Sequence, residues 1–68
     1  MGLVKRSFSL AGHRTSVALE PEFWAALEAL ARARGQTLSA LVAQVDARRD
    51  SARPLASVLR VTALLSRH

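Results

Sequence analysis

One segment of the 68-residue chain clearly alternates between polar and apolar residues: HRTSVAL, from His13 to Leu19. Side chains of a β-strand point alternately to its two faces, so Val17 and Leu19 share an apolar face. The opposite face holds Arg14, Ser16 and Ala18. A lone strand is not stable, because its backbone N–H and C=O groups would lack hydrogen-bond partners. The fold therefore depends on what pairs with this strand.

Two amphipathic helices are predicted after the strand. Pro21 fits the first turn of a helix, and PEFWAALEALARAR spaces apolar residues along one face until Gly35 ends it. We expect Phe23 in the core and Trp24 at the edge of the core or at an interface. QTLSALVAQVDARR predicts a second helix with Thr37 as its N-cap.

A third helix is predicted after the polar break DSARP, in LASVLRVTALLSRH. Its apolar side is expected to hold Leu55, Val58, Leu59, Thr62 and Leu65. The predicted organisation is an N-terminal arm or extra strand over 1–12, a core over 13–49, a linker over 50–54 and a C-terminal helix over 55–68.

The N-terminal KRSFSLAG also alternates, but Phe8 and Leu10 have the opposite parity to Val17 and Leu19. One continuous strand would send the two apolar pairs to opposite faces. A hairpin with a two-residue turn at Ala11-Gly12 would bring them to one face and would gather the polar side chains on the other: Lys5, Ser7, Ser9, Arg14 and Ser16. Ala-Gly is a poor signal for such a turn. A hairpin, a bulge and a loose arm all stay open.

Charge and composition limit the function. The chain has ten Lys and Arg residues but five Asp and Glu residues, which gives a net charge of +5, and no acidic residue precedes Glu20. This balance is typical of proteins that bind nucleic acid, so we expect Lys5 and Arg6 to contact DNA phosphates. No apolar run approaches the roughly 20 residues of a membrane span, and cysteine is absent, which fits a cytoplasmic protein without thiol chemistry.

So short a chain has little core of its own, which favours an oligomer. Two copies of the strand His13–Leu19, antiparallel across a twofold axis, would form a ribbon whose apolar face the helices of both chains cover. A two-stranded ribbon fits the major groove of DNA, where arginine can donate two hydrogen bonds to guanine. The free N–H groups at the start of the second helix would suit a phosphate.

The order of strand, helix, Gly-x-Thr turn and helix, carried by RTSVALEPEFW and ARARGQTLSALVAQV, resembles the ribbon-helix-helix family of bacterial and phage DNA-binding proteins. The near-match to small bacterial members extends to a short C-terminal helix. The resemblance implies a mostly α fold with one short β-strand, in an intertwined homodimer that shares its ribbon. By position it assigns base reading to Arg14, Ser16 and Ala18, and phosphate binding to Thr37, Leu38 and Ser39. The expected dimer core is Val17, Leu19, Phe23, Leu27, Leu30, Leu41, Val42 and Val45.

Two functions are compatible with this reading. The first is a sequence-specific DNA-binding protein, a transcriptional repressor or autoregulator. The second is a dimeric adaptor or antitoxin-like module that contacts another protein through Trp24 or the C-terminal helix. No nucleophile with a base, carboxylate pair or phosphate loop is evident, and His13 and His68 lack partners at ligand spacing. We therefore expect no enzyme activity, no cofactor and no metal.

Overall fold

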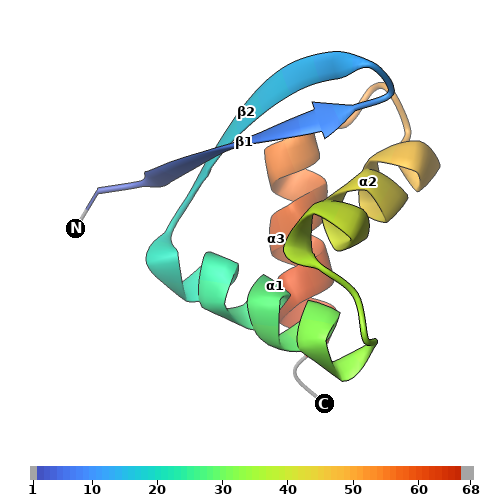
Figure 1. Cartoon of the computed structure of the whole chain (residues 1–68). Coiled ribbons are helices and arrows are strands. Elements are labelled where there is room, and N and C mark those ends of the chain that lie inside the picture. The colour runs from blue at the N-terminus through green and yellow to red at the C-terminus, as the bar shows by residue number, and fades with distance from the viewer. Residues whose placement is uncertain (1, 67–68) are drawn as a thin grey trace.

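The computed structural model describes residues 2–66, in which a two-stranded antiparallel ribbon packs on three helices (Figure 1). The strands are β1, Val4–Leu10, and β2, His13–Leu19. The helices are α1, Pro21–Ala33, α2, Leu38–Arg48, and α3, Leu55–Leu65. Helix α3 runs from the ribbon toward α1 and contacts both. The expectation of a single short strand is wrong, because the N-terminal segment forms a full second strand.

The two strands form a hairpin, and in it the apolar residues of both strands lie on the same face. All seven residues of β1 pair with β2, from Val4 opposite Leu19 to Leu10 opposite His13. Ala11 and Gly12 both have positive φ, 51° and 82°, as a type I′ turn requires. The ribbon in this structure is therefore made within one chain, and β2 has its partner without a second copy.

The apolar face of the ribbon covers the core. Phe8, Leu10, Val17 and Leu19 are all buried on that face, where α2 contacts β1 and α3 contacts β2. The other buried residues come from the helices: Trp24, Leu27, Ala31, Leu41, Val42, Leu59 and Ala63. Of the predicted core, Val17, Leu19, Leu27, Leu41 and Val42 are buried, while Phe23, Leu30 and Val45 pack against them half-buried. Within the described chain these residues form one cluster.

The roles expected for Phe23 and Trp24 are reversed. Trp24 is only 1% exposed, its ring lies 5.8 Å from that of Phe8, and its indole N–H donates to the carbonyl of Val4 at 2.8 Å. Phe23 points instead toward α3, where Arg60 lies over its ring. The prediction was wrong because it assumed one apolar face on α1, whereas α1 packs against both the ribbon and α3. Leu65, expected on the buried side of α3, is 65% exposed.

The ends of the helices follow local rules. At the end of α1 the N–H groups of Gly35 and Gln36 donate to the carbonyls of Arg32 and Ala31, and Gly35 has a φ of 66°. This is a Schellman motif, which needs the left-handed backbone that glycine adopts easily. The N-cap role of Thr37 is confirmed, since its side chain accepts a hydrogen bond from the N–H of Ala40 at 3.0 Å.

An ion pair ties α3 to the junction between β2 and α1. Arg60 Nε donates to Glu20 Oε1 at 3.0 Å. A hydrogen bond from its own backbone N–H, followed by the one from Arg60, holds the pKa of the Glu20 carboxyl below its usual value. The third helix is therefore attached by an electrostatic contact as well as by the buried side chain of Leu59.

Candidate nucleic-acid interface

The face of the ribbon turned away from the helices is polar and basic. It is defined by the outward side chains of both strands, and we call it the outer face: Lys5, Ser7, Ser9, Arg14, Ser16 and Ala18. All are exposed except Ala18, which is half-buried. Three cross-strand pairs follow one another along it, Lys5 with Ala18, Ser7 with Ser16, and Ser9 with Arg14.

Two hydrogen bonds organise the outer face. The hydroxyl groups of Ser7 and Ser16 lie 3.0 Å apart, and Arg14 Nη1 donates to Ser9 Oγ at a long 3.4 Å. A hydroxyl both donates and accepts, and an arginine donates through a planar fork. The outer face therefore offers mixed hydrogen-bonding groups of the kind that can meet the edges of bases.

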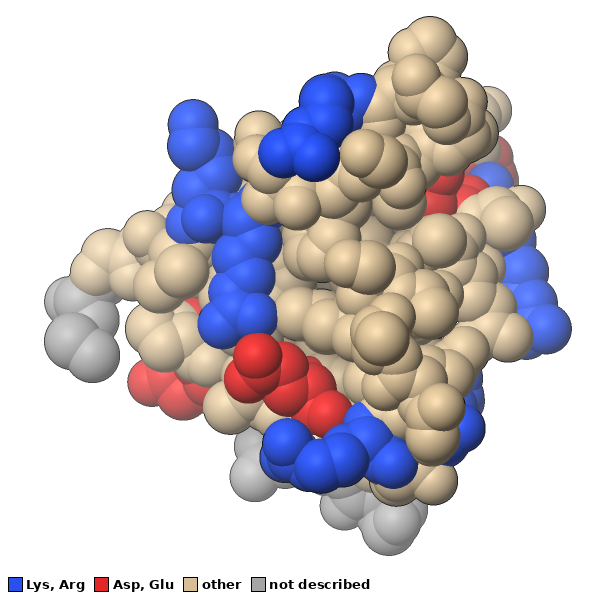
Figure 2. Space-filling view, viewed as in Figure 1, with Lys and Arg blue, Asp and Glu red and all other residues tan. Residues whose placement is uncertain are grey.

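The charges on the outer face favour the binding of an anion. The five acidic residues of the chain all lie at or after Glu20, so the outer face holds none. Three of them are ion-paired elsewhere, Glu20 with Arg60, Glu28 with Arg6, and Asp46 with Arg49. Within residues 2–66 neither Lys5 nor Arg14 has such a partner. Figure 2 shows basic side chains over the ribbon, while the acidic side chains visible on that side lie lower or at its margins.

Arg6 does not join Lys5 on the outer face. It stands opposite Val17 on the core side of the ribbon, where its guanidinium lies 5.0 Å from the centre of the Trp24 ring. Its Nη1 also donates to Glu28 Oε2 at 2.9 Å. The parity of β1 explains this placement, since side chains 6, 8 and 10 point inward together. Arg6 therefore links β1 to α1, and its side chain does not lie on the outer face with Lys5.

The predicted phosphate-binding turn stands at the start of α2. Thr37 and Ser39 are exposed, whereas Leu38 is half-buried against the core. The Thr37 hydroxyl caps the N–H of Ala40 and leaves other N–H groups of the first turn without helical partners. The turn thus keeps the chemistry of an anion site, but on a different element from the ribbon.

The sequence reasoning missed two members of the outer face as site residues. Ser7 and Ser9 were placed on the polar side only if a hairpin formed, and neither was assigned a role. Their parity relative to Arg14 and Ser16 across the Ala11-Gly12 turn was the signal that identified them. With the hairpin formed, they are exposed like Arg14 and Ser16.

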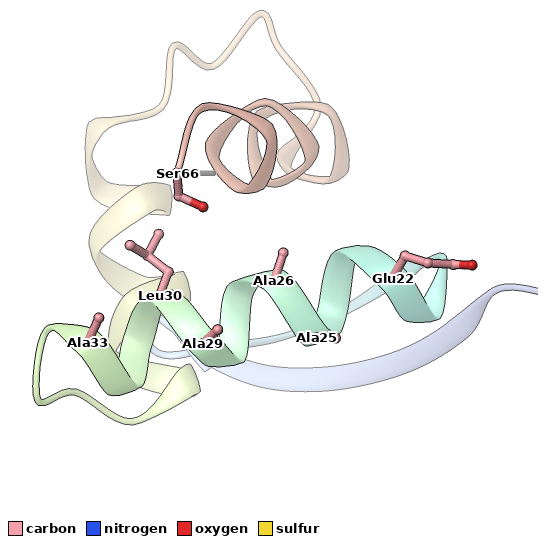
Figure 3. A pocket seen from close by; sticks show the side chains of 7 residues that line it. All are labelled: Glu22, Ala25, Ala26, Ala29, Leu30, Ala33 and Ser66. Carbon is pink, nitrogen blue, oxygen red and sulfur yellow. The ribbon is translucent and has the colours of Figure 1, made fainter. Parts of the chain in front are cut away.

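An open groove of about 660 Å³ lies between α1 and the end of α3 (Figure 3). Its lining is mostly small and apolar: Glu22, Ala25, Ala26, Ala29, Leu30, Ala33 and Ser66. One carboxylate and one hydroxyl do not make a catalytic set. Nor does the described part of the chain bring three His, Cys, Asp or Glu side chains together as a metal site, and His68 lies outside it. None of the described helices is long and apolar enough to cross a membrane.

A two-stranded ribbon followed by two helices that a short turn joins is the arrangement of a ribbon-helix-helix protein. The chain matches the family model described as a ribbon-helix-helix domain over residues 3–66, and it therefore belongs to this family. The match includes β1 and α3, the two elements that exceed the minimal fold. No curated protein and no solved structure matches the chain. Proteins of this family generally bind DNA as transcription regulators.

Proposed function

We propose that this protein is a sequence-specific DNA-binding regulator, a repressor or autoregulator of bacterial transcription, that lays the outer face of its ribbon in the major groove. The observation that carries the proposal is an exposed strip without any carboxylate, formed by both strands and bearing Lys5 and Arg14. A two-stranded ribbon has the width to enter the groove. The cytoplasm is where such a protein would meet its target.

Each proposed contact follows from the chemistry of the side chain. Arg14 would donate two hydrogen bonds to guanine O6 and N7, while Ser16 would bond to a base edge. Ala18 offers only an apolar contact, such as one with a thymine methyl. Lys5, at the end of the strip away from the turn, would contact a phosphate. Arg6 is not part of this proposal, because it is engaged with Glu28.

The start of α2 would add a backbone contact. The free N–H groups of Leu38 and Ser39, together with the positive end of the helix dipole, favour a phosphate oxygen. Such contacts fix the orientation of the protein on the duplex without reading sequence.

The Thr37→Ala variant separates capping from phosphate binding. Loss of the cap should lower the free energy of unfolding by about 1 kcal/mol, measured by chemical denaturation. If the turn contacts DNA, affinity should fall further than the small change in the folded fraction explains. The Thr37→Ser variant retains a capping hydroxyl and is the control. An unchanged affinity would remove this turn from the interface.

We also propose that the protein acts as a homodimer. The groove between α1 and α3 supports a second copy as its occupant, because its lining is mostly small and apolar and could take another helix. Two α1 helices lying antiparallel across a twofold axis could approach closely, because the alanines are small. Leu64, which is 60% exposed, adds apolar surface beside Glu22 and Ala26. Sedimentation of the chain in solution tests this arrangement.

The salt dependence of DNA binding tests the main proposal. Affinity for duplex DNA should fall steeply as salt rises, with a logarithmic slope of about −0.9 for each phosphate contacted. Fluorescence anisotropy with labelled duplexes of different sequence measures both the slope and the preference among sequences. Failure to bind any duplex at low salt would refute the proposal.

That failure would instead favour the alternative function, a protein adaptor or antitoxin-like module. The observation that supports the alternative is the exposure of Leu64 and Leu65 on α3, 60% and 65%. Trp24 is no longer a candidate for the protein contact, because it is buried under the ribbon.

A further inference from the structure

A second hollow, separate from the outer face, lies among the three helices and is bordered by arginines. Arg34 comes from the end of α1, and Arg48 and Arg49 come from the end of α2. One side of α3 completes the lining. The volume of this space is about 220 Å³, and we call it the arginine hollow. No residue of the outer face lines it, so the proposed contacts of the ribbon with DNA do not involve it.

Two of the three arginines have no carboxylate partner in the part of the chain that the structure describes. Arg49 Nε donates to Asp46 Oδ1 at 3.1 Å, and its Nη1 donates to the carbonyl of Arg53 at 2.8 Å. Arg34 and Arg48 form no ion pair within residues 2–66. The helix dipole favours a cation at the end of each helix, but it does not require two such cations to border one hollow. Their charges repel each other, and a bound anion would offset that repulsion.

The polar groups beside these arginines are arranged to donate hydrogen bonds. Gln44 Oε1 accepts from Gln36 Nε2 at 3.3 Å, which leaves the amide N–H groups of Gln44 free to donate into the arginine hollow. The hydroxyl of Thr62 donates to the carbonyl of Val58 at 2.8 Å, so its hydrogen is used inside α3. No acidic residue lines the hollow. Two guanidinium groups and one amide therefore match the oxygens of a phosphate or a carboxylate group.

The rest of the lining is apolar and limits the size of the ligand. Val45 of α2 and Val58 of α3 are half-buried and line the same hollow. Its volume is below the roughly 300 to 1,000 Å³ of a pocket for a drug-sized molecule. We propose that the arginine hollow binds a small organic anion, with its phosphate or carboxylate group on Arg34 and Arg48 and a short apolar part on Val45 and Val58. This site goes beyond DNA binding and does not depend on it.

Titration of the ¹⁵N-labelled chain with phenyl phosphate at constant ionic strength tests the site. The largest changes in the backbone amide signals should fall at residues that line the arginine hollow, and they should saturate. Inorganic phosphate should bind there more weakly because it lacks the apolar part, and phenol should not bind because it lacks the charge. Changes that do not saturate, or that fall mainly on the ribbon, would overturn the proposal.

A charge-matched pair of variants identifies the arginines that bind. Arg34→Gln/Arg48→Gln should weaken the binding of phenyl phosphate by at least about 10-fold, because each arginine donates charged hydrogen bonds. The control is Arg32→Gln/Arg53→Gln, which removes two exposed arginines that do not line the hollow and should leave the affinity unchanged. All four side chains are exposed, so both variants should fold. Equal losses in the two variants would show a general attraction to positive charge and would overturn the site.

The phosphates of DNA offer the same chemistry, and the salt dependence of DNA binding distinguishes this source from a small ligand. With a duplex selected from a random DNA pool, Arg34→Gln/Arg48→Gln should show the same logarithmic slope as the control variant. A slope shallower by about 1.8, at about 0.9 for each lost phosphate contact, would assign these arginines to the DNA backbone and overturn the proposal. If no duplex binds at all, the proposed regulatory function fails, while the titration with phenyl phosphate still decides the arginine hollow.

Discussion

The Leu41→Asp variant should not fold at 25 °C. Leu41 is 0% exposed, and it lies in α2 within the single core that the ribbon and the helices share. A domain of this size is stable by only about 3 to 10 kcal/mol, at roughly 0.05 to 0.15 kcal/mol per residue. An unpaired carboxylate at that site costs several kcal/mol, either as a buried charge or through disruption of the packing. Circular dichroism and thermal melting measure the loss.

Ala43→Asp is the matched control for this variant. Ala43 lies in the same helix, two residues further on, but its side chain is exposed. The new carboxylate there stays in water, so the free energy of unfolding should change by less than about 1 kcal/mol. A cooperative melt of Leu41→Asp close to that of Ala43→Asp would contradict the burial of Leu41.

The sequence predicted the helices well because their end signals are local. Pro21, Gly35 and Thr37 determine where α1 begins and ends and where α2 begins, and these signals do not depend on the rest of the fold. The pairing register of the hairpin was also predictable from parity. Its formation was left open because Ala-Gly is a weak turn signal.

The hairpin forms despite that weak turn because distant packing outweighs a local cost. A left-handed conformation costs an alanine such as Ala11 about 1 to 2 kcal/mol. Full burial of Phe8 and Leu10 contributes about 1.5 to 3 kcal/mol each, which exceeds that cost. A turn propensity examined alone does not include this contribution.

The wrong predictions for Phe23 and Trp24 on α1 and for Leu65 on α3 have a different cause. Helical spacing shows that a helix has an apolar face, but it does not show how many neighbours the helix has. Since α1 packs against both the ribbon and α3, Trp24 and Phe23 point to different neighbours. The ribbon shared between two chains stays a prediction. Within the one chain β1 pairs with β2, and both β1 and α3 contribute buried residues to the core.

The Arg14→Ala variant should lose preferential binding to the selected sequence while the protein stays folded. Arg14 is exposed, and its only side-chain hydrogen bond in the described structure is the 3.4 Å contact to Ser9, so stability should change by less than about 0.5 kcal/mol. A bidentate contact to guanine provides about 1 to 3 kcal/mol of discrimination, which corresponds to about 5- to 150-fold in affinity. Gel-shift titration against selected and unrelated duplexes measures the loss.

Two further variants separate a base contact from simple attraction to phosphates. Arg32→Ala removes one exposed positive charge from the end of α1, so it matches Arg14→Ala in net charge but should leave the preference among sequences intact. Arg14→Lys keeps the charge but loses the planar fork, so binding to unrelated DNA should persist while the preference falls. Equal losses from Arg14→Ala and Arg32→Ala would mean that Arg14 contributes only charge. An unchanged preference in Arg14→Ala would remove Arg14 from the readout and leave the serines of the outer face as the remaining candidates.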